Sequence, residues 1–288
     1  MRTLGLLLVI APCSPQGFFI PTREIAPGVK MPVVSIGTGQ VGGVKHAPAS
    51  DIVGNWLDQG GTGIDTAWMY NDQSEIADTI KQRGVARKDL FITSKLLECF
   101  TGAEHYIDTS LRQLNTTYID LMLIHAPVGD CARTWSVMED YHRRRILRAI
   151  GVSNFNQRNI EGLLKAATIK PAVNQIKYNI YSHDEDTIRY CRDNNIAVEA
   201  YSPLGSWAGH QSRSIFSDPI VQSIEESHNV SAARVALKWI VQRGDILTVL
   251  SDSKVHQADD ADLFDPHFLL SDSEMGELER LAGETVLV

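Results

Sequence analysis

Short apolar runs alternate with longer amphipathic stretches along most of the chain. The apolar runs carry hydrophobic residues at consecutive positions, which is typical of strands covered on both faces. We predict strands over Val33–Ile36, Gly63–Thr66, Leu90–Ser94, Ile119–Ile124, Leu147–Val152, Ala172–Gln175, Ile196–Ala200 and Ile246–Leu250.

The stretches between these strands place apolar residues at helical spacing. In the first of them Ile52, Val53, Trp56 and Leu57 share one helix face, and Gly60 and Gly61 follow its end. We predict helices over Asp51–Asp58, Ser74–Arg83, Ala103–Leu114, Trp135–Arg144, Gln157–Ala167, Glu185–Asn194, Pro219–His228, Ser231–Arg243, His256–Leu263 and Ser271–Leu281.

This alternation predicts one domain rather than two. Eight strand-and-helix units in about 250 residues match a (β/α)8 TIM barrel, and no Pro/Gly/Ser-rich linker interrupts them. Ahead of them, a turn at Pro27 and Gly28 predicts a short N-terminal hairpin. We therefore expect a single α/β barrel domain over residues 20–288, with a doubly wound open sheet as the alternative.

The first 19 residues form an extension to that domain. Arg2, the apolar run Leu4–Ala11 and a following stretch rich in small residues have the outline of a signal peptide, and the run is too short to span a membrane. An extra apolar strand explains the same pattern equally well. Entry into a secretory pathway or an organelle through residues 1–17 therefore stays open.

Composition narrows the class of protein. The chain has 43% hydrophobic and 22% charged residues, as in an ordinary globular protein, and its net charge of -8 opposes binding to nucleic acid or to an anionic membrane. The four cysteines, at positions 13, 99, 131 and 191, form no C-x-x-C pair. Their wide spacing predicts neither a zinc site nor a disulfide framework, and no other metal site is expected.

Gly37, Gly39 and Gly42 match the G-x-G-x-x-G pattern of dinucleotide-binding folds. That fingerprint must open directly into a helix, whereas Pro48 disfavours an early helix here, and no acidic residue closes a second strand at the expected offset. We expect these glycines to form a loop at the mouth of the barrel instead.

Polar residues follow the apolar run of every predicted strand from the second onward. In a barrel these strand ends converge on one face, where active sites are found. A single such residue is readily explained as a cap or a buried polar group, but seven sets at one edge are not. They are Asp65 with Tyr70, Lys95, His125, Ser153 with Asn154, Gln175, Tyr201 with Ser202, and Ser251 with Asp252 and Ser253.

These residues lie in segments that resemble the aldo-keto reductase family. Asp65 and Tyr70 lie in Gly-Ile-Asp-Thr-Ala-x-x-Tyr, Lys95 in Phe-Ile-Thr-Ser-Lys-Leu, and His125 in Asp-Leu-Met-Leu-Ile-His-x-Pro. Ala-Ile-Gly-Val-Ser-Asn-Phe at 149–155 and Ala-Tyr-Ser-Pro-Leu-Gly at 200–205 are similar to further signatures of the family. The resemblance covers about residues 22–281.

The resemblance implies a nicotinamide-dependent reduction of a carbonyl group. Tyr70 is then the general acid, Lys95 an ammonium that lowers the pKa of the phenol, and Asp65 the partner of Lys95. His125 is expected to donate a hydrogen bond to the substrate oxygen, and Tyr201 to stack on the nicotinamide. The residues implied in cofactor binding are Gly37, Thr38, Asp65, Ser153, Asn154, Gln175, Tyr201, Ser202, Leu204, Ser206 and Ser253.

The segment after the last strand departs from the family pattern. NADP-preferring members have Pro-Lys-Ser there and an Arg a few residues later, whereas this chain has Ser251-Asp252-Ser253 and Ala258. A carboxylate repels a 2′-phosphate, so we expect weakened discrimination between NADP(H), the family default, and NAD(H).

Substrate and partners follow from the same resemblance. Leu97 and Ala126 occupy positions where many relatives have tryptophan, and Trp68 lies close to Tyr70 in the sequence, which suggests an open site for small aldehydes, ketones or sugars. The short loop Val128–Arg133 favours a small monomeric enzyme, and the family resemblance implies a location in the cytoplasm. The alternatives are a cofactor-binding scaffold like the β-subunits of potassium channels and an open-sheet dinucleotide sensor.

Overall fold

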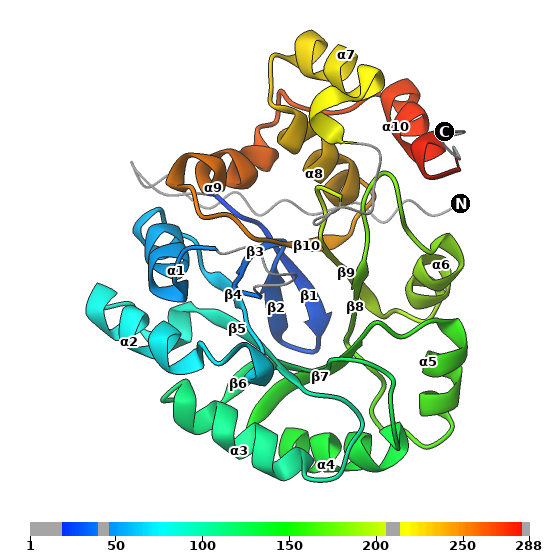
Figure 1. Cartoon of the computed structure of the whole chain (residues 1–288). Coiled ribbons are helices and arrows are strands. Elements are labelled where there is room, and N and C mark those ends of the chain that lie inside the picture. The colour runs from blue at the N-terminus through cyan, green and yellow to red at the C-terminus, as the bar shows by residue number, and fades with distance from the viewer. Residues whose placement is uncertain (1–18, 40–45, 206–213, 284–288) are drawn as a thin grey trace.

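The barrel predicted from the strand pattern is present. The computed structural model describes residues 19–39, 46–205 and 214–283, and within them eight parallel strands close in the order β10-β3-β4-β5-β6-β7-β8-β9 (Figure 1). The open sheet is therefore excluded. The barrel strands are β3 (Val34–Gly37), β4 (Gly63–Asp65), β5 (Phe91–Leu96), β6 (Ile119–Ile124), β7 (Leu147–Ser153), β8 (Val173–Lys177), β9 (Ala197–Tyr201) and β10 (Ile246–Val249).

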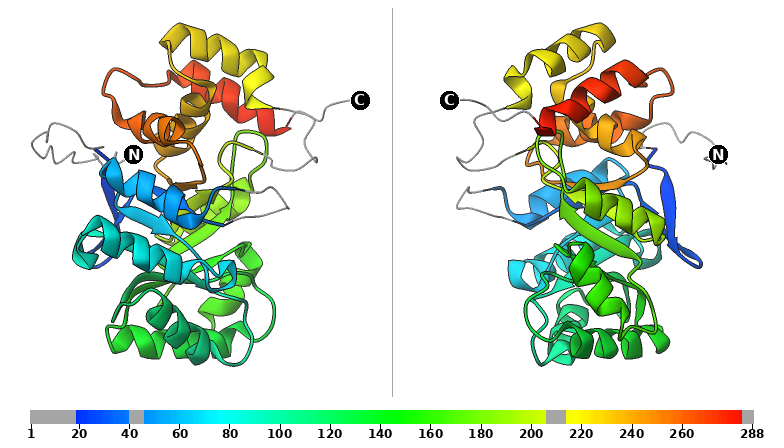
Figure 2. Two further views of the ribbon diagram at one scale, coloured as in Figure 1. Left: turned by 60° about the vertical axis from the view of Figure 1, so that its left-hand side comes forward. Right: turned by 90° about the vertical axis from the view of Figure 1, so that its right-hand side faces the viewer.

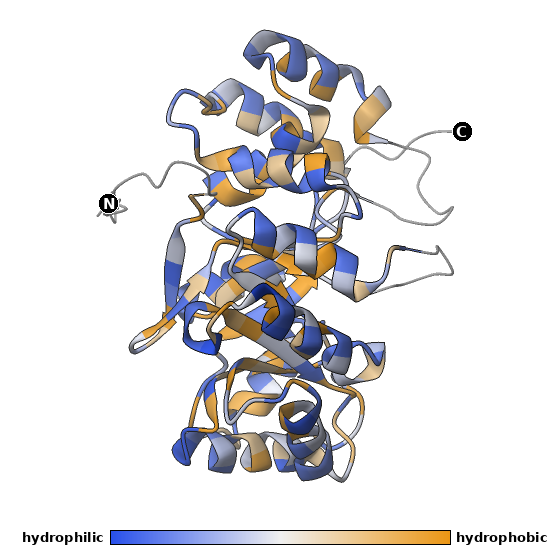
Figure 3. Cartoon of the chain, turned by 90° about the vertical axis from the view of Figure 1, so that its left-hand side faces the viewer, coloured by the Kyte–Doolittle hydropathy of each residue, from blue (hydrophilic) through white to orange (hydrophobic). Residues whose placement is uncertain are grey.

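Helices surround the barrel and differ from the predicted ranges mainly at their ends. Figure 3 shows hydrophilic residues on these helices around a largely hydrophobic interior. The α-helices are α1 (Ala49–Asp58), α2 (Gln73–Arg83), α3 (Ala103–Gln113), α4 (Cys131–Arg143), α5 (Gln157–Leu164), α6 (Glu185–Asp193), α7 (Pro219–His228), α8 (Ala232–Gln242), α9 (Lys254–Ala261) and α10 (Asp272–Arg280). The 3₁₀ segments are η1 (Trp68–Tyr70), η2 (Arg87–Asp89), η3 (Ile215–Ser217), η4 (Asp262–Phe264) and η5 (Leu281–Gly283).

Successive residues of each barrel strand point alternately to the helices and into the barrel. On β6, Met122 and Ile124 pack in the outer hydrophobic cluster, while Leu121 and Leu123 pack in the inner one. Both faces of the strand are covered, which explains why its residues 121–124 form an apolar run without polar alternation.

The predicted hairpin closes one end of the barrel. It consists of β1 (Thr22–Ala26) and β2 (Val29–Pro32), which pair antiparallel around Gly28 with φ 72°. Met31 is fully buried against inner side chains such as Phe91 and Leu121, and burial of such a side chain contributes about 1.5–3 kcal/mol. The hairpin lies at the end where the strands begin (Figure 2), so the opposite end is the one that carries the polar residues.

The interior becomes polar toward the ends of the strands. Thr93, Gln175, Glu199 and Thr248 are all buried there, although the first inner layer is apolar. Buried polar groups require partners, so this change of composition inside the barrel marks the region where a site is built.

Helix α4 begins at Cys131, four residues before the predicted start at Trp135. The side chain of Asp130 accepts a hydrogen bond from the backbone N–H of Arg133 and caps the helix. The loop predicted at Val128–Arg133 is therefore shorter than expected, because a capping side chain starts a helix before its apolar face begins.

The cysteine spacing predicted no disulfide framework, yet one pair of cysteines is bonded. Cys99 and Cys131 are bonded, with a Cα–Cα distance of 4.6 Å and a sequence separation of 32 residues. Cys99 follows β5 and Cys131 follows β6, and these strands are neighbours in the barrel. Parallel strand pairing brings together loops that are distant in sequence, which cysteine spacing alone does not reveal. Cys191 is buried and not bonded to another cysteine.

No helix among the described residues is long and apolar enough to cross a membrane. The possible signal peptide, residues 1–17, and the last glycine of the G-x-G-x-x-G match, Gly42, lie outside the described residues. Strand β3 ends at Gly37, and the first helix among the described residues, α1, begins at Ala49.

Replacement of Cys99 by serine should lower the free energy of unfolding by about 2–4 kcal/mol, because the unfolded chain loses a cross-link. The measurement is urea unfolding under non-reducing conditions. Denatured wild-type protein should also gain two titratable thiols on reduction, one from each bonded cysteine. In reductant, wild type and Cys99→Ser should unfold at nearly the same urea concentration; a difference that persists there would assign the loss of stability to packing instead.

Candidate active site

The four residues of the predicted catalytic set meet at the C-terminal end of the barrel. Asp65 is the last residue of β4, Tyr70 ends the short η1, Lys95 lies near the end of β5, and His125 directly follows β6. The three strands are consecutive in the barrel, so residues up to sixty positions apart in sequence face one another.

Asp65 and Lys95 form a buried ion pair. The Lys95 Nζ lies 2.5 Å from Asp65 Oδ1, and only 1% of the lysine and 5% of the aspartate side chain are exposed. Lys95 Nζ also donates to the carbonyl oxygen of Thr66 at 3.0 Å. Burial by itself lowers the pKa of Lys95, but the charge of Asp65 outweighs it and the net pKa is raised. The lysine is therefore a fixed ammonium at neutral pH.

Tyr70 is held by contacts on both sides of η1. Thr66 precedes η1 and Asp72 follows it, and Thr66 Oγ1 donates a hydrogen bond to Asp72 Oδ1 at 2.6 Å. This bond closes the segment between the end of β4 and α2. Across it, a Cβ on Gly39 would lie 2.8 Å from the Tyr70 ring carbon Cζ and 2.9 Å from its hydroxyl oxygen. Gly39 therefore leaves room for the phenol, which explains one glycine of a motif that sequence pattern matching associates with a different fold.

The phenol of Tyr70 faces the ammonium of Lys95. The Lys95 Nζ lies 5.1 Å from the centre of the Tyr70 ring. Burial raises the pKa of Tyr70, the charge of Lys95 opposes this, and the charge of Asp65 raises it further, so the net pKa is raised. The charge of Lys95 exerts the predicted lowering effect on the pKa of Tyr70, but the raising effect of burial is larger.

His125 is neutral at physiological pH. Burial and the charge of Lys95 lower its pKa from 6.5 to about 3. Its ring lies edge-on to Tyr70 with 5.8 Å between the ring centres, and its buried Nδ1 has no hydrogen-bond partner among the described residues. A neutral imidazole carries one N–H and one acceptor nitrogen, so a polar atom placed beside Tyr70 can hydrogen-bond to this ring.

Gln175 links the ion pair to a second carboxyl group that sequence reasoning did not single out. Its Nε2 donates to Asp65 Oδ2 at 2.8 Å and to Glu199 Oε2 at 2.9 Å. Glu199 is on β9 with no exposed surface. The signal in the sequence that could have identified Glu199 is an acidic residue within the otherwise apolar strand Ala197–Tyr201.

Ser153, Asn154 and Tyr201 form a second polar group beside this one. Asn154 Nδ2 donates to the backbone oxygen of His125 at 2.9 Å and to Ser153 Oγ at 3.1 Å. The Tyr201 hydroxyl donates to Asn154 Oδ1 at 2.8 Å. One asparagine thus connects the ends of β6, β7 and β9.

Two residues of this edge have left-handed backbone conformations. Asn154 has φ 61° and Ser202 has φ 51°, and each directly follows a barrel strand. Such conformations are unfavourable for residues other than glycine, least so for asparagine, and cluster at functional sites. Asn154 N donates to Gln175 O at 2.8 Å, which holds its turn in place.

Comparison with known proteins decides the family. The model of the aldo/keto reductase family matches residues 33–282. The chain belongs to the aldo-keto reductase family. It is an oxidoreductase, and the expectation drawn from the sequence motifs is confirmed. The structure shows why those motifs are spaced as they are: each is the end of one barrel strand.

Named relatives match this aldo-keto reductase over most of their length. It is 36% identical over 265 residues to glyoxal reductase of Bacillus subtilis, covering 90% of this chain and 92% of the relative. It is 33% identical over 274 residues to morphine 6-dehydrogenase of Pseudomonas putida, with 91% of each chain covered. A third relative, 30% identical and covering 89% of this chain and 93% of its own, is the NAD/NADP-dependent indole-3-acetaldehyde reductase of Schizosaccharomyces pombe.

Solved structures agree with the fold. An aldo/keto reductase from Brucella melitensis superposes with a TM-score of 0.83 at 29% identity and covers 91% of this chain and 100% of its own. The aldo-keto reductase AKR2E5 in its complex with NADPH gives a TM-score of 0.85 at 27% identity, with 92% and 88% covered.

The remaining predicted cofactor residues of this aldo-keto reductase lie around the same edge. Thr38 N donates to Asp65 O at 3.0 Å, directly after β3 ends at Gly37. Leu204 is half-buried near the end of the β9 segment, whereas Ser206 lies outside the described residues. Ser253 is the N-cap of α9, where its side chain accepts from His256 N.

Asp252 precedes that cap and contacts another loop. Its Oδ1 lies 3.3 Å from Nδ1 of His46, and its side chain is 42% exposed. The pair is an ion pair only when the imidazole is protonated. It connects the loop after β10 with the loop after β3, so both loops border the position where the family pattern has a basic residue.

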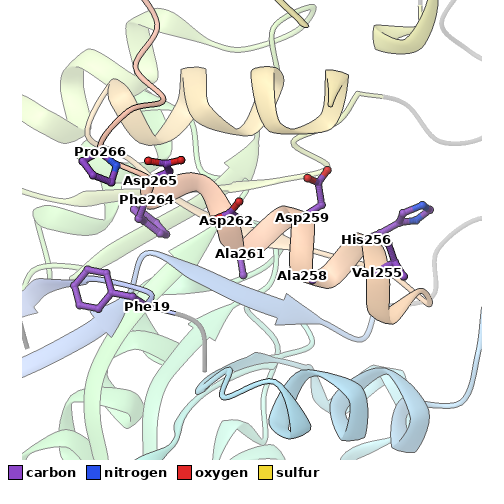
Figure 4. Close-up of a pocket in the computed structure, with 10 residues that line it drawn as sticks. All are labelled: Phe19, Val255, His256, Ala258, Asp259, Ala261, Asp262, Phe264, Asp265 and Pro266. Carbon is purple, nitrogen blue, oxygen red and sulfur yellow. The ribbon is translucent and has the colours of Figure 1, made fainter. Parts of the chain in front are cut away.

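A hollow of about 780 Å³ lies along α9 (Figure 4), and neither Tyr70 nor Lys95 is among the residues that line it. Ala258 lines it, and so do the carboxylates of Asp259 and Asp262. Arg234 from α8 pairs with both of these carboxylates, at 3.9 and 3.1 Å. No lysine or arginine is among the described residues that line the hollow, which are Phe19, Val255, His256, Ala258, Asp259, Ala261, Asp262, Phe264, Asp265 and Pro266.

The disulfide lies in the two loops that border Lys95 and His125. Cys99 N donates to Val128 O at 2.8 Å, so the loops after β5 and β6 are hydrogen-bonded as well as cross-linked. Phe100 and Val128 are 45% and 49% exposed. Trp68 packs edge-on against Tyr106 with 4.7 Å between ring centres. These side chains give the rim beside Lys95 and His125 an exposed apolar surface.

The neutral state of His125 predicts a pH dependence of stability. The unfolded imidazole binds a proton below its ordinary pKa of 6.5, while the folded one stays neutral down to about 3. The unfolded state therefore binds more protons in this window, and stability is lost as pH falls through it. In His125→Gln the slope of the unfolding free energy against pH should be smaller than in wild type between pH 6.5 and about 3. Urea unfolding at several pH values measures it; equal slopes in the two proteins would show that His125 titrates normally.

Proposed function

We propose that this aldo-keto reductase reduces small aldehydes or ketones with a nicotinamide cofactor and that Tyr70 is the general acid. The observation that carries the proposal is the buried Lys95–Asp65 ion pair beside the Tyr70 phenol and the neutral His125. The names of the relatives, among them a glyoxal reductase and an indole-3-acetaldehyde reductase, support a carbonyl substrate.

The residues at the barrel mouth fit a nicotinamide cofactor. Gly37 and Gly39 bring no side chain into the space at the end of β3, and a Cβ on Gly37 would meet Thr248 Oγ1 at 3.1 Å. Ser153 and Asn154 offer hydroxyl and amide groups of the kind that bind a carboxamide. The Nε2 of Gln175 is engaged inside the barrel, so the group that this residue offers to a carboxamide is its side-chain oxygen.

The cofactor supplies the hydride, which no protein side chain provides. Tyr70 donates its phenolic proton to the substrate oxygen as negative charge develops there. The phenolate that remains faces the ammonium of Lys95, which stabilises it in a water-poor site. His125 donates a hydrogen bond from its neutral ring to the same oxygen and orients the carbonyl. Asp65 keeps the ammonium in place.

We propose weak discrimination between NADP(H) and NAD(H). Asp252 takes the place of a basic residue in the family pattern and Ala258 the place of another, and no lysine or arginine is among the described residues lining the hollow along α9. Carboxylates of that hollow raise the energy of a nearby 2′-phosphate, although Arg234 offsets two of them. A relative named for use of both NAD and NADP is consistent with this choice.

Removal of the Tyr70 hydroxyl tests the mechanism. Tyr70→Phe should lower kcat roughly 100-fold or more, because general acid catalysis contributes at least that much, while the affinity for NADPH stays near that of wild type. The measurement is turnover of a generic aldehyde, with cofactor binding followed by tryptophan fluorescence.

Tyr190→Phe is the matched control, because it removes a phenolic hydroxyl from α6 at a distance from the site. Its kcat should equal that of wild type. Full turnover by Tyr70→Phe would rule out this phenol as the acid. An inactive wild type that still binds NADPH would instead favour the scaffold role.

Reversal of one charge tests the cofactor choice. Wild type should bind NADPH and NADH with affinities within about tenfold of each other. Asp252→Lys should shift the ratio toward NADPH by roughly tenfold, because a change of two charges near a phosphate is worth about 1–2 kcal/mol even in water. The measurement is titration of both cofactors at low salt, where screening is weak.

Asp140→Lys makes the same change of charge on the exposed face of α4 and should leave the ratio unchanged. A wild-type protein that already binds NADPH many-fold more tightly than NADH would contradict the proposed weak discrimination.

A further inference from the structure

Glu199 is a buried carboxyl group that the mechanism above does not use. It has no exposed surface and points into the barrel from β9. Its Oε2 accepts from Gln175 Nε2 at 2.9 Å, whereas its Oε1 has no hydrogen-bond partner among the described residues. A buried charged oxygen without a donor is unfavourable, so the surroundings of Glu199 disfavour its ionised form.

The charges around Glu199 lead to the same conclusion. The charged groups that face it are Asp65 on β4 and Lys95 on β5. Its neighbours on the adjacent strands, Gln175 on β8 and Ile246 on β10, do not titrate. One ammonium neutralises one carboxylate, and Asp65 already forms the ion pair with Lys95. A second carboxylate in this dry interior would be uncompensated.

The contacts also give Glu199 a mechanical role. A single nitrogen, Gln175 Nε2, donates to both carboxyl groups and is held between them. The amide of Gln175 therefore has one favoured orientation, with its nitrogen inside the barrel. In that orientation it fixes Asp65 Oδ2, while Asp65 Oδ1 binds Lys95.

We propose that Glu199 is an uncharged positioning residue that orients Gln175 and, through it, the Asp65–Lys95 pair beside Tyr70. It touches neither substrate nor the reacting atoms. Its acceptor oxygen is the feature that matters, and its negative charge is not. This inference deepens the proposed carbonyl reduction and rests on it.

The proposal predicts different kcat values for two substitutions of Glu199. Glu199→Gln keeps an acceptor oxygen for Gln175 and carries no charge, so its kcat should stay within about threefold of wild type. Glu199→Ala removes the acceptor and should lower kcat by about tenfold or more, with a much smaller change in KM for the aldehyde. Steady-state kinetics with a generic aldehyde and NADPH measures both.

Thr248→Val is the control for disturbance of the barrel interior. Thr248 is buried on the neighbouring β10, and its hydroxyl has no hydrogen-bond partner among the described residues. Its kcat should equal that of wild type. Normal kcat in Glu199→Ala would overturn the positioning role. A loss in Glu199→Gln as large as in Glu199→Ala would show that the negative charge is required, which also overturns the proposal.

Stability provides a readout that does not depend on activity. Burial and the charge of Asp65 raise the pKa of Glu199 from its ordinary 4.5 to about 8. Between these values the folded protein keeps a proton that the unfolded chain has lost, so wild type loses stability as pH rises through the window. The glutamine variant has no such loss. The melting temperature of Glu199→Gln minus that of wild type should therefore increase as the pH rises from 4.5 to about 8, and should stay constant at higher pH.

These outcomes distinguish the inference from the proposed function. A difference in melting temperature that does not change between these pH values would show an ionised Glu199 and overturn the inference even in an active enzyme. Wild-type protein without carbonyl turnover would contradict the proposed function, whereas the pH-dependent melting would still report the state of Glu199.

Discussion

The active site depends on one ion pair held in the dry interior of a barrel. A lysine and an aspartate that are almost completely buried stabilise each other only if their geometry is good and their remaining hydrogen-bonding capacity is used. Here Lys95 also donates to the Thr66 carbonyl, and Asp65 also accepts from Gln175. The ammonium is thereby fixed beside Tyr70, and burial together with this nearby charge lowers the pKa of His125 and keeps it neutral. The electrostatic properties of the site therefore follow from burial and from where this positive charge is placed.

The interior of the barrel changes from apolar at one end to polar at the other, and this change makes such an ion pair possible. At the end where the strands begin, the hairpin inserts Met31 into an apolar layer, and this layer supplies hydrophobic stabilisation. Toward the other end several inner residues are polar and buried, and Gln175 links two of them, Asp65 and Glu199. The result is a rigid apolar base beneath a polar network, and the network can therefore hold its side chains in single orientations.

The loops complete the site and give this protein its individual features. The Cys99–Cys131 bond ties together the two loops next to Lys95 and His125. On the opposite side of the mouth, Asp252 contacts His46 at a position where relatives that prefer NADP have a basic residue. In the proposed mechanism the strand ends carry the chemistry, while the loops form the rim around them. This division of roles is expected when a rigid scaffold positions variable loops.

The amino-acid sequence by itself determined the barrel, the order of its elements and the identity of the four residues at its mouth. It did so because apolar runs report burial on both faces, and because polar residues at the ends of parallel strands must share one edge. Only the tertiary structure decided which side chains touch. The Cys99–Cys131 bond, the space that Gly39 leaves for Tyr70 and the link from Gln175 to Glu199 join residues from different strands and loops. Such contacts depend on strand register and loop path in three dimensions, which local residue patterns do not encode.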